Sequence, residues 1–261
     1  MDKIQWGCIK LFWIINAKRL KQYLIILAAA LFALGIAWAE RDNISSLTSG
    51  SGPSAIYKVD TKEKKIALTF DISWGEERAK PILDILKQKG VTKSTFFLSS
   101  PWSETHPDIV KQIKDMGFEI GSHGHKHVNY SSLDDEEIRN QILKADTILK
   151  GLTGTSPKLI RTPNGDFDKR VLRIAGELGY TVIQWDTDSK DWMNPGTTQI
   201  VNNVLKKAHP GDIVLLHASD SCKQTHEALP TIIDELRKQG YEFVSVSELL
   251  AGAKINTKEV K

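Results

Sequence analysis

Three histidines stand close together between residues 122 and 127, in the sequence Ser-His-Gly-His-Lys-His. His123 and His127 are four residues apart, a spacing that lets two imidazoles reach one metal ion when the segment is a turn or the start of a helix. We expect His125 to point to the other side of the backbone, although it could replace one of the two as a ligand. The spacing predicts a metal site, and two histidines without a metal remain the alternative.

An acid and a histidine each end an apolar run. Asp71 follows Ile-Ala-Leu-Thr-Phe, so its carboxylate is either a loop cap or a buried acid or base. His217 follows Ile-Val-Leu-Leu and could be a core histidine bonded to the backbone. Asp191 is available to raise its proton affinity. Side chains of these types at strand ends favour general acid–base chemistry.

Arg161 lies in the sequence Arg-Thr-Pro-Asn-Gly. Its guanidinium could form a surface ion pair, but a planar guanidinium is also the group that best orients a carboxylate. Cys222 has no recognisable nucleophile signature around it, so we expect a small packed side chain.

Short apolar runs and longer amphipathic runs alternate along the chain and must position these residues. About seven β/α units predict an α/β fold, a distorted parallel (β/α)7-type barrel, in which loops at the carboxyl ends of the strands form the active site. An open doubly wound sheet fits the same alternation, but no glycine-rich nucleotide loop follows a strand. The expected strands are 66–70, 94–98, 119–122, 159–161, 181–185, 212–216 and 242–244, and the expected helices are 77–89, 107–116, 134–152, 169–178, 198–207 and 227–238.

The net charge of +3 over 261 residues is concentrated at the N-terminus. Residues 1–22 hold five basic side chains and one aspartate, so the rest of the chain is close to neutral. A nearly neutral main domain offers no electrostatic footprint for nucleic acid, and we expect no nucleic-acid partner.

A charge-free apolar run follows at 23–39 and is just long enough for a membrane-spanning helix. The preceding basic residues predict a cytoplasmic N-terminus and an extracytoplasmic domain, either as a single-pass protein of the cell membrane or as a secreted one if the run is a cleaved signal peptide. The expected organisation is a cytoplasmic basic segment at 1–22, an anchor or signal peptide at 23–39, a flexible linker at 40–58, the α/β domain at 59–252 and a polar tail at 253–261.

The residues singled out above also resemble, in order, five motifs of the polysaccharide deacetylase family, known as the NodB homology domain or carbohydrate esterase family 4. The resemblance covers about residues 60–250. Its motifs here are Thr69-Phe70-Asp71-Ile72, His123-Gly124-His125-Lys126-His127, Arg161-Thr162-Pro163-Asn164-Gly165, Asp188-Ser189-Lys190-Asp191-Trp192 and Leu215-Leu216-His217. The anchor and the sequence Asp-Ile-Ser-Trp-Gly resemble the sporulation-associated, PdaB-like branch, which implies a forespore or mother-cell envelope.

The resemblance implies hydrolysis of N-acetyl groups from amino sugars of cell-envelope polysaccharide such as peptidoglycan, assisted by a divalent metal: zinc first, or cobalt or nickel. Asp71 would be the general base and His217 the general acid. Arg161 would orient Asp71, and Asp191 would tune His217. The implied metal ligands are His123 and His127, and the implied walls of the acetyl pocket are Pro163, Trp192 and Leu215.

Three positions depart from the family pattern. Ile72 stands where the family has its metal-binding aspartate, so metal affinity should be weak or absent. Gly124 replaces a serine or threonine that braces the histidine motif, and Asn164 replaces an aromatic residue of the third motif.

Three hypotheses follow from these matches and departures. The first is an active deacetylase in which water, His125 or Asp188 fills the vacant metal position. The second is a carbohydrate-binding protein with little or no turnover. The third is a metal-independent hydrolase that uses Asp71 and His217.

Overall fold

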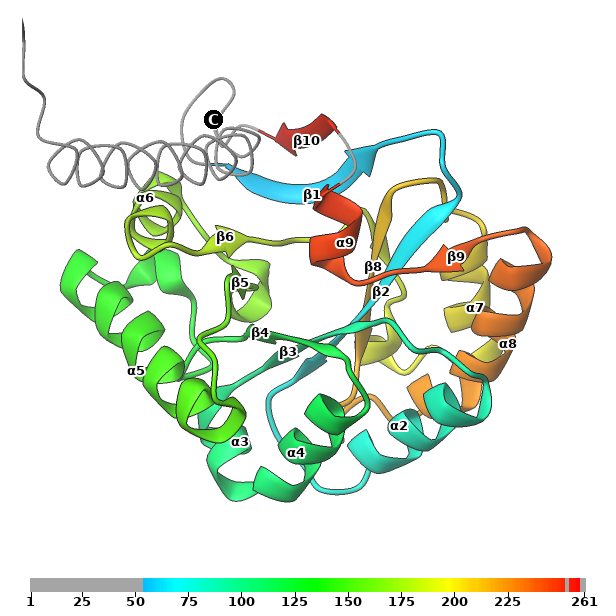
Figure 1. The fold of residues 1–261 in the computed structure, drawn as a ribbon, viewed down its shortest axis with the longest axis horizontal. Helices are drawn as coiled ribbons and strands as arrows, with labels where there is room; N and C mark the ends of the chain where they lie inside the picture. Colours follow the sequence, from blue (N-terminus) through cyan, green and yellow to red (C-terminus); the bar gives the residue numbers. More distant parts are fainter. Residues whose placement is uncertain (1–53, 252–253, 259–261) are drawn as a thin grey trace, which may run out of the picture. The chain divides into compact units, whose positions relative to one another are not determined.

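The centre of the molecule is a sheet of parallel strands, seen in a computed structural model that describes residues 54–251 and 254–258 (Figure 1). Strand β2 lies between β8 and β3, and the order continues through β4 and β5 to β6. Two short strands, β7 and β9, pair with β8 and β2 respectively. The parallel strands are β2 (Lys65–Ile72), β3 (Thr95–Leu98), β4 (Glu119–Ser122), β5 (Leu159–Ile160), β6 (Thr181–Val182), β7 (Thr187–Asp188), β8 (Asp212–His217) and β9 (Glu242–Phe243).

Strand β1 (Ala55–Asp60) brings the two ends of this sheet together. It pairs antiparallel with β8 at Lys58 and Asp212, and Ile56 forms a parallel bridge to Ile183, directly after β6. The amide of Gln184 donates to the carbonyl oxygen of Ile56 at 2.7 Å. Because β1 contacts both ends, the sheet is a nearly closed, barrel-like one, in agreement with the α/β barrel expected and not with an open doubly wound sheet.

The helices cover the outside of the sheet (Figure 1). The longest of the described helices, α5, begins after Asp134, whose side chain accepts a hydrogen bond from the amide of Glu137, and ends at Gly154 in the left-handed conformation. The helices are α2 (Ala79–Gln88), α3 (Ser100–Thr105), α4 (Pro107–Asp115), α5 (Asp135–Thr153), α6 (Lys169–Glu177), α7 (Thr197–Leu205), α8 (Thr225–Lys238) and α9 (Val246–Ala251).

The pleat of β2 separates two environments. Ile66, Leu68, Phe70 and Ile72 all belong to the apolar cluster that contains residues of α2, α4 and α8. The alternate side chains, among them Thr69 and Asp71, point to the inside of the barrel because successive residues of a strand face opposite sides. The register of this one strand therefore decides which residues can reach the site.

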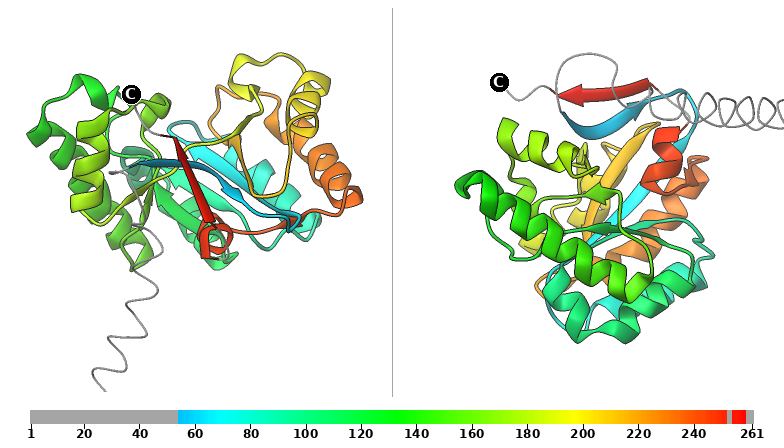
Figure 2. Two further views of the ribbon diagram at one scale, coloured as in Figure 1. Left: turned by 90° about the horizontal axis from the view of Figure 1, so that it is seen from above. Right: turned by 60° about the vertical axis from the view of Figure 1, so that its left-hand side comes forward.

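The chain ends differ from the sequence-based expectation. Strand β1 begins at Ala55, inside the segment expected to be a linker, and β10 (Lys254–Lys258) pairs antiparallel with β1, where a polar tail was expected (Figure 2). In place of one strand at 181–185, the chain forms β6, the bridge at Ile183 and then β7. Neither end carries enough apolar alternation to be recognised as a strand without its partner.

The expected membrane anchor or signal peptide at 23–39 and most of the linker lie outside the described residues. In the part of the chain that the structure describes, no helix has the length and apolar character needed to cross a bilayer.

Gly211 precedes β8 and touches the backbone of β1. It has φ +80°, and a Cβ there would lie 2.0 Å from the carbonyl oxygen of Val59. We expect Gly211→Ala to lower the free energy of unfolding by about 2 kcal/mol more than Gly179→Ala. Gly179 has a similar φ of +78°, but its added Cβ would have no described atom within 4 Å. Urea unfolding of both variants measures the difference, and equal losses would contradict the close approach of β1.

Candidate active site

The residues predicted to do chemistry meet at the carboxyl ends of the parallel strands. Asp71 in β2 lies opposite His217 in β8 in the strand register. His123 follows β4, Arg161 follows β5, and Asp191 comes three residues after the end of β7. Parallel strands that run side by side end at one edge of the sheet, so residues far apart in sequence share one site.

Asp71 is bound to a fully buried arginine. The Nη1 of Arg161 donates to Oδ1 of Asp71 at 2.8 Å, and the two side chains have exposures of 0% and 6%. Burial alone would raise the pKa of Asp71, but the charge of Arg161, with those of His123 and His217, lowers it overall. The carboxylate is therefore ionised at neutral pH and able to accept a proton.

Arg161 itself is held on all sides. Its Nη1 donates to Oγ1 of Thr69 at 2.8 Å and its Nη2 to the carbonyl oxygen of Gln184 at 2.9 Å, while the guanidinium lies 4.3 Å from the ring centroid of Phe97. These contacts leave the guanidinium one orientation. As a result Asp71 presents a fixed Oδ1 to Arg161 and a free Oδ2 to the site.

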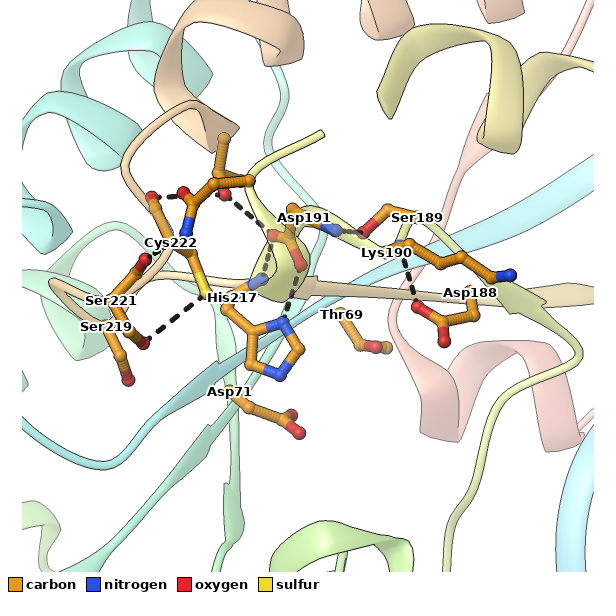
Figure 3. Close-up of polar contacts among 12 residues, drawn as sticks. Thr69, Asp71, Asp188, Ser189, Lys190, Asp191, His217, Ser219, Ser221 and Cys222 are labelled. Carbon is orange, nitrogen blue, oxygen red and sulfur yellow. Dashed lines mark hydrogen bonds and ion pairs between the residues drawn. The ribbon is translucent and has the colours of Figure 1, made fainter. Parts of the chain in front are cut away.

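His217 lies between two carboxylates, Asp191 and Asp71 (Figure 3). Its Nδ1 is 2.7 Å from Oδ1 of Asp191, and its own amide donates to Oδ2 of the same carboxylate at 2.8 Å. The hydroxyl of Thr225 donates to that Oδ2 as well, at 2.7 Å. Burial lowers the pKa of His217, but the charge and hydrogen bond of Asp191 outweigh it and the pKa is raised. An imidazolium with Nε2 directed away from Asp191 can act as a proton donor.

His123 and His127, the two expected metal ligands, lie beside each other. Nδ1 of His123 is 2.7 Å from the carbonyl oxygen of Arg161, which can only accept, so Nδ1 carries the proton and Nε2 is free. The ring of His127 packs edge-on at 5.5 Å between centroids. Burial lowers the pKa of His123 to about 4 and also lowers that of His127, so both imidazoles are neutral, as ligation requires.

A third ligand is missing from this pair, so the described residues fit a divalent metal only in part. Ile72 is fully buried in the apolar cluster outside the sheet, with Leu98 as its register partner in β3. The Oδ2 of Asp71 lies 4.0 Å from Nε2 of His123, but a metal bound there would occupy the oxygen that is free to act as a base. The site therefore offers two nitrogens and no spare carboxylate.

Each of the two proposed replacement ligands, His125 and Asp188, has a hydrogen-bond partner of its own. Nδ1 of His125 is 2.8 Å from the hydroxyl of Ser100, and the charges that act on it come from residues of α3, α5 and the adjoining loop. Oδ1 of Asp188 accepts from the amide of Lys190 at 2.8 Å, and its side chain lies apart from Asp71 in Figure 3.

Cys222 joins Asp191 and His217 in a group whose potential ligand atoms lie within 4.8 Å of one another. Both oxygens of Asp191 are already bonded to His217 and Thr225, and burial raises the pKa of Cys222 to about 12. The cysteine is thus a buried thiol beside His217, in accord with the packed role expected. Thr225 was not predicted as a site residue, because a threonine at the start of a helix has no sequence pattern that distinguishes it from other threonines.

Comparison with known proteins agrees with this geometry. The model of the polysaccharide deacetylase family matches residues 58–183. A peptidoglycan-N-acetylglucosamine deacetylase of Bacillus cereus is 40% identical over 197 residues, which cover 74% of this chain and 92% of that protein. The chain belongs to the polysaccharide deacetylase family.

Other relatives differ in what they do. The peptidoglycan-N-acetylmuramic acid deacetylase PdaA of Bacillus subtilis is 33% identical over 200 residues, which cover 75% of each chain. The crystal structure of a family 4 carbohydrate esterase pseudoenzyme from Bacillus anthracis matches with a TM-score of 0.72 at 36% identity, over 77% of this chain and 70% of that one. A mutant of that pseudoenzyme with restored enzymatic activity matches equally well. The family thus includes close structural relatives with and without activity.

Two departures from the polysaccharide deacetylase pattern have visible local consequences. Gly124 has φ +75°, and a Cβ there would lie 2.1 Å from the hydroxyl oxygen of Tyr130, which occupies the space of a larger residue. Asn164, with φ 58°, donates through Nδ2 to Oδ1 of Asn129 at 2.7 Å. Gly124 thus leaves room for Tyr130, and Asn164 links the loop after β5 to the loop after the histidines.

The three residues expected to wall the acetyl pocket are not equally covered. Leu215 is 3% exposed on the inner face of β8, and Pro163 is buried after β5. Trp192 is 51% exposed, so most of its indole faces solvent rather than a closed pocket. The structure therefore places Leu215 and Pro163 in the interior and Trp192 at the rim.

Ile72→Asp tests the direction of this side chain. In the absence of metal we expect it to lower the free energy of unfolding by about 3 kcal/mol, because it buries an unpaired carboxylate among apolar groups. Ile72→Val should cost about 1 kcal/mol. Urea unfolding with and without zinc measures both. Full recovery of Ile72→Asp to wild-type stability in zinc would show that residue 72 can turn inward.

Asp191→Asn tests the source of the proton affinity of His217. Removal of the carboxylate charge should lower the pKa of His217, since burial then acts against less opposition. NMR titration of the histidine ring nitrogens measures this pKa. Asp188→Asn is the control, because it also replaces a carboxylate by a carboxamide at the same edge of the sheet. A pKa that falls equally in both variants would contradict a specific effect of Asp191.

Proposed function

We propose that this protein hydrolyses N-acetyl groups from amino sugars of a peptidoglycan-type glycan. The observation that carries the proposal is the pair of opposed proton carriers at one strand edge: an ionised Asp71 held by Arg161, and His217 held by Asp191. Amide hydrolysis requires both, because water must lose a proton and the leaving amine must gain one. A protein that only bound glycan would not need either group to be oriented.

Each residue has a defined part in this chemistry. Asp71 accepts the proton of the attacking water through Oδ2, while Arg161 keeps the carboxylate ionised and in position. His217 donates a proton to the amine nitrogen as the carbon–nitrogen bond breaks, and Asp191 stabilises the imidazolium before transfer. The products are acetate and a free amino group on the sugar.

His123 and His127 would hold the divalent metal, with zinc first and cobalt or nickel as alternatives. When bound, such a metal polarises the acetyl carbonyl and acidifies water. Without a carboxylate at position 72 we expect weak affinity, so the ion would exchange with the medium.

The site would act outside the cytoplasm. The basic residues at 1–22 and the apolar run at 23–39 favour a single membrane anchor, or a signal peptide, that exports residues 59–252. Peptidoglycan lies on that side of the membrane. As part of the same proposal, the resemblance to the PdaB-like branch favours a role in the forespore or mother-cell envelope.

A second function, glycan binding with little or no turnover, is favoured by one observation. Ile72 packs in the outer apolar layer, and a pseudoenzyme is among the solved structures that this chain resembles. The two functions differ in whether acetate is released, and a metal-independent hydrolase differs from both in its response to a chelator.

Acetate release from N-acetylated peptidoglycan fragments tests the proposal. We expect the full-length protein to release acetate in the presence of zinc, and Asp71→Asn to reduce kcat by about 100-fold or more. Asp188→Asn, which alters a carboxylate at the same edge, should stay within about twofold. Glycan binding without acetate release would favour the second function, and release that a chelator does not change would favour the metal-independent hydrolase.

A further inference from the structure

The exposed apolar side chains of the described residues gather at the edge that carries the site. Five large apolar side chains are exposed, and four of them follow strands β2, β4 and β7 at their carboxyl ends. The five are Trp74 (56% exposed), Val128 (36%), Leu143 (47%), Trp192 (51%) and Met193 (57%). Single exposed apolar residues are ordinary on protein surfaces, but a group of them around a polar site marks a ligand-binding surface.

The backbone beneath Trp74 is rigidly held although its indole is in solvent. The carboxylate of Asp220 accepts hydrogen bonds from the amides of Glu76, Glu77 and Arg78 at 2.9, 3.0 and 2.9 Å. Gly75, with φ +99°, leaves no room for a Cβ, which would meet Cγ of Asp220 at 2.1 Å. This turn is thus built around Asp220, and Trp74 is carried at its start.

The same turn is fixed relative to the catalytic pair. The chain after β2 runs beside the chain after β8, because the amide of Ala218 donates to the carbonyl oxygen of Asp71, that of Ser73 to Oγ of Ser219, and that of Asp220 to the carbonyl oxygen of Trp74. Trp74 is three residues from Asp71, a span of at most about 10 Å of extended chain. The backbone that carries this indole is therefore close to the candidate base.

The turn that carries Trp192 and Met193 is bonded to the same segment through Asn194. The side chain of Asn194 donates to the carbonyl oxygen of Ser221 and accepts from the amide of Lys223, each at 2.8 Å. Lys190 and Asn194, on either side of this turn, both have positive φ. Backbone held in this region persists where surrounding contacts impose it, which is common at binding sites.

We propose that Trp74 is a substrate-binding residue that stacks on a pyranose ring adjacent to the acetylated sugar, so that the site selects glycan chains over single sugars. The proposal rests on the proposed function for the identity of the glycan. Pyranose rings present faces of C–H groups, and a flat aromatic face in a fixed position binds them with little loss of conformational entropy. Trp192 and Met193 add two exposed apolar side chains from the turn after β7, which is bonded to the segment that carries Asp220.

Calorimetric titration of the full-length protein with N-acetylglucosamine and with its β-1,4-linked tetramer tests this. We expect Trp74→Ala to weaken tetramer binding by about tenfold and to leave monomer binding unchanged, while Trp74→Phe keeps most of the affinity. Leu143→Ala, which removes an equally exposed apolar side chain from α5, is the matched control and should bind both sugars as the wild type does.

The outcomes separate this inference from the proposed function. If the wild type binds no tetramer, or if Leu143→Ala loses as much affinity as Trp74→Ala, the role of Trp74 is overturned. If Trp74→Ala loses tetramer affinity while no variant releases acetate, the stacking role stands and the hydrolytic function fails. Circular dichroism of each variant shows whether an altered affinity reflects the surface or the fold.

Discussion

The ion pair between Arg161 and Asp71 is the interaction on which the site depends. Both side chains are withdrawn from water, and removal of one partner from such a pair typically costs about 3–5 kcal/mol because the other charge is left buried. The guanidinium donates to three further groups, namely the Thr69 hydroxyl of β2 and the carbonyl oxygens of Ile183 and Gln184. The barrel interior is thus assembled around a charge whose position also sets the direction of the base.

That arrangement explains why the two candidate proton carriers are in place while the candidate metal site lacks a carboxylate. The proton carriers depend on side chains that point into the barrel, and the pleat of β2 supplies Thr69 and Asp71 to that face. The same pleat sends Ile72 outward, where it contributes to the apolar layer beneath the helices. An apolar residue at this position stabilises the sheet-to-helix packing and removes a metal ligand by the same contact.

The segment that follows His217 connects the parts of the rim. Asp220 of this segment accepts a hydrogen bond from the turn after β2, and its backbone accepts one from Asn194 of the turn after β7. The Thr225 hydroxyl donates to the carboxylate of Asp191. Short polar contacts therefore couple the positions of Trp74, Trp192 and the proton donor. A glycan that contacts the rim would meet a surface whose parts do not move independently.

The family, the α/β alternation and the candidate residues Asp71, His123, Arg161 and His217 could be predicted from the sequence, because these four residues stand directly after apolar runs typical of strands. The sequence did not reveal β1 and β10, since strands with weak alternation are recognisable only by their partners. It also could not show that Ile72 packs outside the barrel, that Thr225 completes the environment of Asp191, or that Trp74 is held rigidly in solvent. Those facts depend on the register between strands distant in sequence and on loops that meet only at the sheet edge. Such contacts form only when the chain is folded, because the local sequence does not specify which distant segment lies beside it.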